Sequence, residues 1–142
     1  MRVSQMMSVN LVTCPGTTTV GEACRLMSGA NVGSVLVCDG GQLRGIFTER
    51  DVLRLVAEGR AVERELVSDQ MTSSVVSVAP DARAEEVAEL MNRRHIRHLP
   101  VVDGGTPVGL VSLRDFFVMS GAILRAQGAD AASEMLRAAT VH

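Results

Sequence analysis

The chain has 142 residues, of which 46% are hydrophobic and 21% are charged, which is enough apolar material for one compact domain with a core. Its formal charge of −2 divides evenly, because residues 1–70 and residues 71–142 each carry eight acids and seven arginines, so neither half is built to bind a polyanion. No apolar run approaches the roughly 18 residues that span a bilayer, and no secretion signal opens the chain, so we expect a cytoplasmic protein without a membrane partner.

The first half of the chain predicts a short strand over Leu11–Cys14 followed by a helix. Thr19 and Glu22 have the spacing of a capping box, so we expect the helix to begin there. Its apolar residues recur at i, i+3, i+4 and i+7, which gives the helix one core-facing stripe. The stripe consists of Val20, Ala23, Cys24 and Met27.

Two strands joined by a tight turn come next. They are expected over Ser34–Cys38 and Leu43–Phe47, around an Asp-Gly-Gly turn whose glycines accept positive φ. A second helix is expected from about Glu49 to Glu58. The first half is therefore predicted to form a β-α-β-β-α unit.

The second half repeats the first, because a shift of 64 positions aligns Met7–Leu53 with Met71–Phe117 without a gap. The equivalent helix has the same apolar stripe, but Arg83 replaces the capping threonine, so we expect Asp81 to cap it. The equivalent stripe consists of Ala84, Val87, Ala88 and Met91. The equivalent strands are expected over His98–Val102 and Pro107–Val111, and the second helix over about Leu113–Leu124.

The repeat predicts an α/β (α+β) fold of two β-α-β-β-α units, related by a pseudo-two-fold axis and packed as one module. We expect repeat 1 with its connecting segment over 1–66, repeat 2 over 67–120 and a helical tail over 121–142. One such unit buries little apolar area alone, so two should share a core and leave a ligand cleft between them. The tail has small apolar residues suited to the module's own core or, as we favour, to a second subunit: Ala122, Ile123, Ala126, Ala131, Ala132, Met135 and Leu136.

A short motif stands at the strand-to-helix junction of both repeats: Gly, apolar, any residue, Ser or Thr, two residues, Asp. It runs from Gly45 to Asp51 and from Gly109 to Asp115. In this motif the chain resembles the CBS domain family, and its tandem arrangement resembles a free-standing CBS pair, or Bateman module. The resemblance covers roughly Met7–Phe117 and implies a homodimer, in which two pairs form a disc of four units.

The residues of the motif suit the binding of a nucleotide. A carboxylate one helical turn past a strand can accept hydrogen bonds from a ribose diol, so Asp51 and Asp115 are the ribose candidates. A hydroxyl at the start of a helix can meet a phosphate, so Thr48 and Ser112 are phosphate candidates. The resemblance places the base near the first strand of each repeat, lined by Val12, Thr13, Val76 and Ser77. The alternative is that these hydroxyls and carboxylates only cap helices.

The two repeats differ in charge next to this motif. Arg97 and His98 stand where the first repeat has Gly33 and Ser34. An arginine can bind phosphate through two hydrogen bonds, and the segment resembles the phosphate-contacting segment of nucleotide-binding family members. We therefore predict one strong nucleotide site and one weak or empty site. The alternative is that the basic residues form a solvated surface, and this is the interpretation that we favour for Arg93 and Arg94.

Other uses of these residues are disfavoured. The chain has no Trp or Tyr on which bases could stack, and its three Phe are expected in the core, so we do not expect nucleic acid to be the ligand. A zinc site of His95 and His98 with a cysteine would cross a helix-to-strand break without dependable geometry. The three cysteines have no CxxC spacing and are expected to be reduced and structural: Cys14, Cys24 and Cys38.

An enzyme is not predicted. All fourteen basic residues are arginine, which excludes a Schiff-base lysine and a P-loop, and about 25 residues follow the repeats, too few for a catalytic domain. We expect a sensor that requires no cofactor or metal and binds an adenine nucleotide or adenosine-containing ligand between its repeats. Candidates are AMP, ADP, ATP, S-adenosylmethionine and NAD, with or without magnesium, and the occupancy would be signalled to an unidentified protein partner. The alternative is a structural or oligomerisation module without a ligand.

Overall fold

The computed structural model describes residues 1–127 and 136–138 and divides the chain into two compact units. The Asp51 unit consists of Asn10–Val75 and Gly105–Pro107. The Asp115 unit consists of Met1–Val9, Val76–Gly104 and the described residues from Val108 onward. Each unit therefore combines segments that are distant in the sequence.

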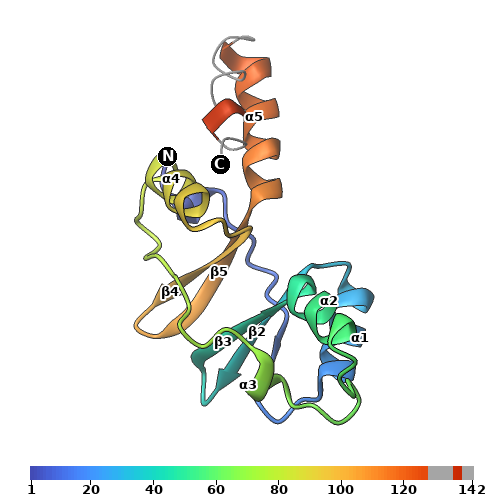
Figure 1. Ribbon diagram of the computed structural model, residues 1–142. Helices are drawn as coiled ribbons and strands as arrows, with labels where there is room; N and C mark the ends of the chain where they lie inside the picture. Colours follow the sequence, from blue (N-terminus) through green and yellow to red (C-terminus); the bar gives the residue numbers. More distant parts are fainter. Residues whose placement is uncertain (128–135, 139–142) are drawn as a thin grey trace. The chain divides into compact units, whose positions relative to one another are not determined.

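The Asp51 unit is built on a three-stranded sheet in the order β1-β2-β3 (Figure 1). Its strands β1 and β2 are parallel, whereas β2 and β3 form an antiparallel hairpin. The core includes Val35, Val37 and Phe47, none of which has exposed surface. The elements are β1 (Thr13–Cys14), α1 (Val20–Ala30), β2 (Ser34–Asp39), β3 (Gln42–Thr48), α2 (Glu49–Ala57) and α3 (Val67–Gln70).

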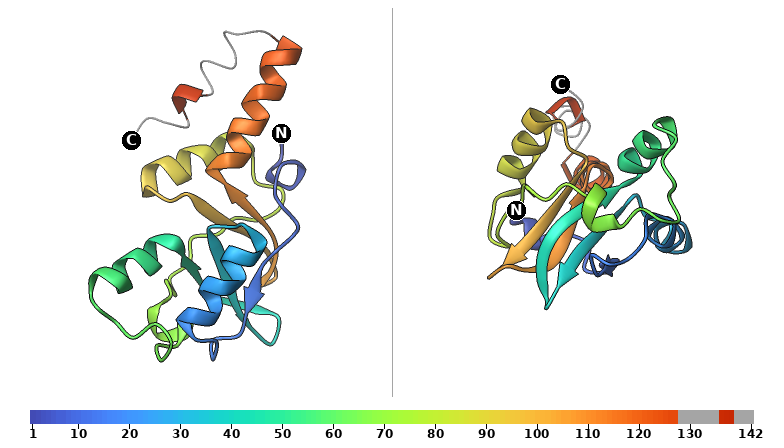
Figure 2. Two further views of the ribbon diagram at one scale, coloured as in Figure 1. Left: turned by 90° about the vertical axis from the view of Figure 1, so that its right-hand side faces the viewer. Right: turned by 60° about the horizontal axis from the view of Figure 1, so that its bottom comes forward.

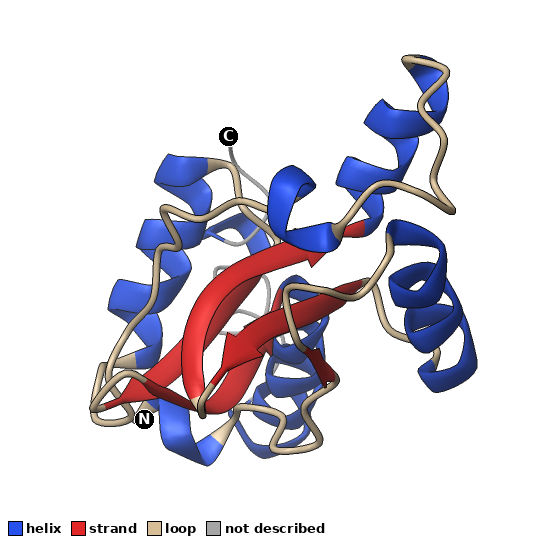
Figure 3. Cartoon of the chain, turned by 90° about the horizontal axis from the view of Figure 1, so that it is seen from below, coloured by secondary structure: helices blue, strands red, loops and turns tan. Residues whose placement is uncertain are grey.

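The Asp115 unit repeats this plan around a two-stranded hairpin. Figure 3 shows the strands of the chain in red and its helices in blue. The counterpart of β1 is reduced to a single parallel bridge between Val78 and Val101. The core includes Val87, Leu99 and Val111. The elements are the 3-10 turn η1 (Val3–Gln5), α4 (Ala84–Arg94), β4 (His98–Asp103), β5 (Thr106–Ser112) and α5 (Leu113–Gln127).

The two units exchange the segments that precede their repeats. Val3, at the start of the chain, is fully buried in the Asp115 unit, and its amide donates to the carbonyl of Ala82. The N-terminal segment, dark blue in Figure 2, runs on beside β5, where Ser8 pairs with Leu110. Val67 occupies the equivalent place in the Asp51 unit, where its amide donates to the carbonyl of Thr18. Each packed unit therefore contains segments of both repeats. The boundaries 1–66, 67–120 and 121–142 describe the order of the repeats along the sequence, and they stay a prediction.

The predicted starts of the two first helices have different outcomes. Thr19 caps α1 as predicted, because its hydroxyl accepts the amide of Glu22 at 3.2 Å. The prediction that Asp81 caps α4 is wrong, because the N-cap residue is Arg83 and no side chain bonds the helix there. The amide of Ala84, at the start of α4, donates instead to the carbonyl of Met1, so the exchanged segment replaces a side-chain cap.

The predicted hairpins are confirmed, and the glycines of both turns have positive φ, with values from 59° to 84°. The first strand is shorter than the predicted Leu11–Cys14. None of the helices in the described part of the chain is long and apolar enough to cross a membrane. Of the predicted tail contacts, the side chains of Ala122, Ile123 and Ala126 and the whole of Ala131, Ala132 and Met135 lie outside the described residues.

Candidate functional site

The predicted ribose and phosphate residues are adjacent in each unit. In the Asp115 unit, the Oδ2 atom of Asp115 accepts the amide of Ser112 at 2.7 Å and its hydroxyl at 3.2 Å. In the Asp51 unit, Asp51 Oδ2 accepts the amide of Thr48 at 2.9 Å and its hydroxyl at 3.3 Å. Each carboxylate therefore fixes the junction between a strand and the helix that follows, as the capping alternative predicts.

These hydrogen bonds use only one oxygen of each carboxylate. The Oδ1 atoms of Asp51 and Asp115 take no part in the capping bonds, so they are the atoms left to accept a ribose hydroxyl. Capping and ribose binding are thus compatible within one side chain. A phosphate, by contrast, needs a donor, so the hydroxyl of Ser112 or Thr48 would have to turn its proton away from the carboxylate.

The backbone brings the predicted basic residues to the start of α5. The amide of Leu113, the first residue of α5, donates to the carbonyl of Arg97 at 3.1 Å. Arg97 is exposed, and the half-buried His98 follows it as the first residue of β4. Ser112 and Asp115 therefore lie near Arg97 and His98, which replace the uncharged Gly33 and Ser34 of the first repeat.

The Asp51 unit has the same backbone contacts without the basic residues. Here the amide of Glu49 donates to the carbonyl of Gly33 at 3.0 Å, and Ser34 pairs with Thr48 across the hairpin. Ser34 is buried, with 4% of its surface exposed. A phosphate at Thr48 would consequently meet a glycine and a buried hydroxyl in place of an arginine and a histidine.

The predicted base-pocket residues flank the first strand of each unit. The carbonyl of Val12 accepts the amide of Leu36, and Thr13 pairs with the same residue. In the Asp115 unit, Val78 bonds to Pro100 and Val102, which places the preceding Val76 and Ser77 beside the beginning of β4. Val12 and Val76 pack against the cores, whereas Thr13 and Ser77 are exposed.

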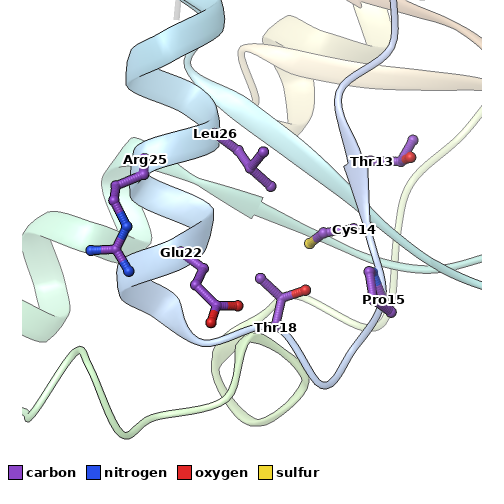
Figure 4. Close-up of a pocket in the computed structure, with 7 residues that line it drawn as sticks. All are labelled: Thr13, Cys14, Pro15, Thr18, Glu22, Arg25 and Leu26. Atoms are coloured by element: carbon purple, nitrogen blue, oxygen red, sulfur yellow. The ribbon is translucent and has the colours of Figure 1, made fainter.

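A pocket of about 430 Å³ in the Asp51 unit was not predicted from the sequence (Figure 4). It lies between β1 and α1, and Thr13 is the one base-pocket candidate among its lining residues. Its Arg25 guanidinium is held by both carboxylate oxygens of Glu63, at 3.0 and 3.3 Å. No motif marks this space, because its lining comes from β1, the loop that follows it and one face of α1: Thr13, Cys14, Pro15, Thr18, Glu22, Arg25 and Leu26.

The cysteines are free, and none of the three is fully exposed. Burial raises the pKa of the Cys14, Cys24 and Cys38 thiols above the ordinary value of 9.0, so all three are neutral near pH 7. Among the residues that the structure describes, no three His, Cys, Asp or Glu side chains are grouped as metal ligands.

The aromatic residues correct one expectation. Phe47 and Phe116 are buried, but Phe117 is 44% exposed, so its predicted place in the core is wrong. It occupies the position in α5 that exposed Leu53 has in α2. Periodicity does not distinguish neighbouring apolar residues at the edge of a helical stripe.

These features define a protein of two related α/β units, each with a hydroxyl and a carboxylate at a strand-to-helix junction. The model of the CBS domain family matches residues 3–58 and again residues 64–119. The chain belongs to the CBS domain family, with two CBS domains in tandem.

Known proteins of similar sequence and structure agree with this assignment. The CBS domain-containing protein YhcV of Bacillus subtilis is 38% identical over 117 residues, which cover 82% of this chain and 83% of YhcV. Other curated relatives are longer, and the chain spans about a fifth of two proteins of Arabidopsis thaliana, 20% of one and 19% of the other.

Two similar solved structures contain adenosine compounds. A CBS domain protein of Pyrobaculum aerophilum complexed with AMP has a TM-score of 0.80 at 26% identity, covering 91% of this chain and all of that one (100%). The CBS domain pair of protein MJ0100, in complex with 5′-methylthioadenosine and S-adenosyl-L-methionine, has a TM-score of 0.79 at 25% identity and covers 86% of this chain and 97% of that one.

Proposed function

We propose that the protein is a regulatory module that binds an adenine nucleotide or adenosine-containing ligand and signals its occupancy to a partner protein. The observation that carries the proposal is the carboxylate of Asp115, whose Oδ2 atom caps α5 while Oδ1 is left for a ligand. The ligands in the two similar structures share an adenosine group and differ in whether they carry phosphate. A site that recognises ribose through a carboxylate suits all of them.

In the proposed complex, Asp115 accepts hydrogen bonds from the ribose diol. Arg97 and His98 neutralise the phosphate, and the Ser112 hydroxyl donates to it. Val76 and Ser77 lie against the base. Thr48, Asp51, Val12 and Thr13 would form the corresponding site of the other unit, where the basic residues are missing. Binding regulates a partner only if the ligand prefers one of two arrangements of the protein.

A structural or oligomerisation module is the second candidate, because helix capping alone accounts for the bonds of Asp51 and Asp115. Large apolar side chains on the second helix of each unit also favour a homodimer. Leu53 and Val56 on α2 are 70% and 62% exposed, and Val118 on α5 is 67% exposed. A dimer is compatible with both functions, so self-association does not decide between them.

Thermal unfolding with a panel of nucleotides tests the proposal. The panel contains AMP, ADP, ATP, S-adenosylmethionine, NAD and GTP, followed by calorimetry or a dye because the chain has no Trp or Tyr. A ligand at about 100 times its dissociation constant adds roughly 2.7 kcal/mol of stability, which raises the midpoint by several degrees. We expect this shift with adenosine ligands, and we expect Asp115→Ala to abolish it.

The exposed Asp69 supplies a matched control, since Asp69→Ala also removes a carboxylate from the first turn of a helix. Each variant is compared with its own ligand-free midpoint, so that the loss of a helix cap is not mistaken for a loss of binding. If the folded wild-type protein shows no shift with any compound, the structural or oligomerisation function is the correct one.

A further inference from the structure

The two ribose candidates have different neighbours one helical turn further on. Asp51 and Asp115 are equivalent under the shift of 64 positions, and so are Arg54 and Val118. The Arg54 guanidinium lies 3.6 Å from the Oδ1 atom of Asp51. At the same place beside Asp115 stands an apolar side chain, and no ion pair to Asp115 is formed by any residue that the structure describes.

This difference concerns the oxygen that a ribose would use. Oδ2 of Asp51 is occupied by the amide and hydroxyl of Thr48, so Oδ1 is the atom left to accept the diol. The Arg54 guanidinium forms its ion pair with that same Oδ1 atom. A nucleotide would have to displace the arginine from Asp51, whereas no such displacement is needed at Asp115.

Arg54 is held in this position by two further partners. It donates to Glu58 Oε1 at 3.2 Å and to the backbone carbonyl of Gln70, at the end of α3, at 3.3 Å. A side chain with three partners loses more contacts when it swings away than one paired with a carboxylate alone. Asp51 and Glu58 together also carry more negative charge than Arg54 neutralises, so this cluster does not attract a phosphate in place of the ribose.

We propose that Arg54 closes the ribose site of the Asp51 unit, so that each chain binds one nucleotide, at Asp115. Gly33 and Ser34 act in the same direction, because they offer the phosphate no positive charge. The inference rests on the proposed function. It adds which of the two units binds the nucleotide and names a residue that determines this preference. Arg54 determines which of the two sites is occupied by pairing with Asp51, and it makes no contact with the bound nucleotide.

An exchange of the two residues tests the inference. AMP is titrated by calorimetry into the full-length wild-type protein, Arg54→Val, Val118→Arg and a control, Arg60→Met, which removes the comparable exposed ion pair of Arg60 with Glu65 at 2.8 Å. We expect one AMP per chain for the wild type and the control, and a second binding event for Arg54→Val. Val118→Arg should weaken binding about two- to five-fold, the effect of an exposed ion pair that must be broken.

Three results would overturn the inference while leaving the proposed function intact. They are two equal AMP sites in the wild-type protein, unchanged affinity in Val118→Arg, or weaker binding in Arg54→Val, which would make Arg54 a ligand contact. Wild-type protein that binds no compound of the panel would refute the proposed function itself. If Arg54→Val fails to fold, Arg54→Met removes the charge with a side chain of similar length, and Val118→Arg, at an exposed position, remains decisive.

Discussion

Replacing Gly45 by alanine should destabilise the Asp51 unit, because the segment from the other repeat lies directly on this glycine. A Cβ atom at Gly45 would meet Met71, with the Cγ atom at 2.7 Å, and the backbone carbonyl oxygen of Thr72 at 2.9 Å. That carbonyl is fixed by its hydrogen bond from the amide of Ile46 at 3.0 Å. We expect a loss of about 1–3 kcal/mol, the usual cost of an overpacked site, and a melting midpoint lower by roughly 3–12 °C.

The equivalent Gly109 gives an internal comparison. A Cβ atom there would meet side-chain atoms of Met7 at its three nearest contacts, with no backbone atom among them. A flexible methionine can move aside, so Gly109→Ala should cost less than Gly45→Ala. Shortening the methionine should also rescue Gly109→Ala more completely, because Met71→Ala leaves the carbonyl of Thr72 in contact.

Chemical denaturation of the single and double variants measures these couplings. The free energies of Gly109→Ala and Met7→Ala should be non-additive by at least about 0.5 kcal/mol, since the two residues touch. Additive effects in both pairs, or a cost for Gly109→Ala equal to that for Gly45→Ala, would show that the exchanged segments do not pack as described.

Three further predictions concern stability and the thiols. Thr19→Ala should cost about 1 kcal/mol in denaturation experiments, because the amide of Glu22 loses its 3.2 Å cap. Phe116→Ala should cost about 3–5 kcal/mol and Phe117→Ala much less, since these side chains are 2% and 44% exposed. Burial raises the pKa of Cys14, so its contribution to stability is complete below pH 9.0 and is lost as the pH rises further, a loss that should be absent in Cys14→Ala.

Local chemistry accounts for most of the fold that could be predicted from the sequence. The capping box at Thr19 and the glycines of the Asp-Gly-Gly turns act on their immediate neighbours, so their residues specify the structure almost alone. The cap of α4 could not be predicted in this way, because the carbonyl that accepts from Ala84 belongs to Met1, at the start of the chain and outside the repeat that contains α4. Self-similarity shows which residues are equivalent but not which copy they pack against.

The candidate site shows the same division between local and distant effects. The hydroxyl and carboxylate of each junction are three residues apart, and their bonds follow from that spacing. The role of Arg54 depends on Gln70, which lies on another element, so no motif contains it. The pocket beside Arg25 has no signal in the sequence either, because a surface formed by a short strand, a loop and a helix face repeats no pattern.

A crystal structure of the protein grown with AMP would show whether Asp115 holds the ribose. We expect ribose hydroxyls within hydrogen-bonding distance of Asp115 Oδ1 and the phosphate near Ser112 and Arg97, while Asp115 Oδ2 still caps α5. AMP bound away from these residues, or no AMP at a concentration that saturates a nucleotide sensor, would show that Asp51 and Asp115 are helix caps alone.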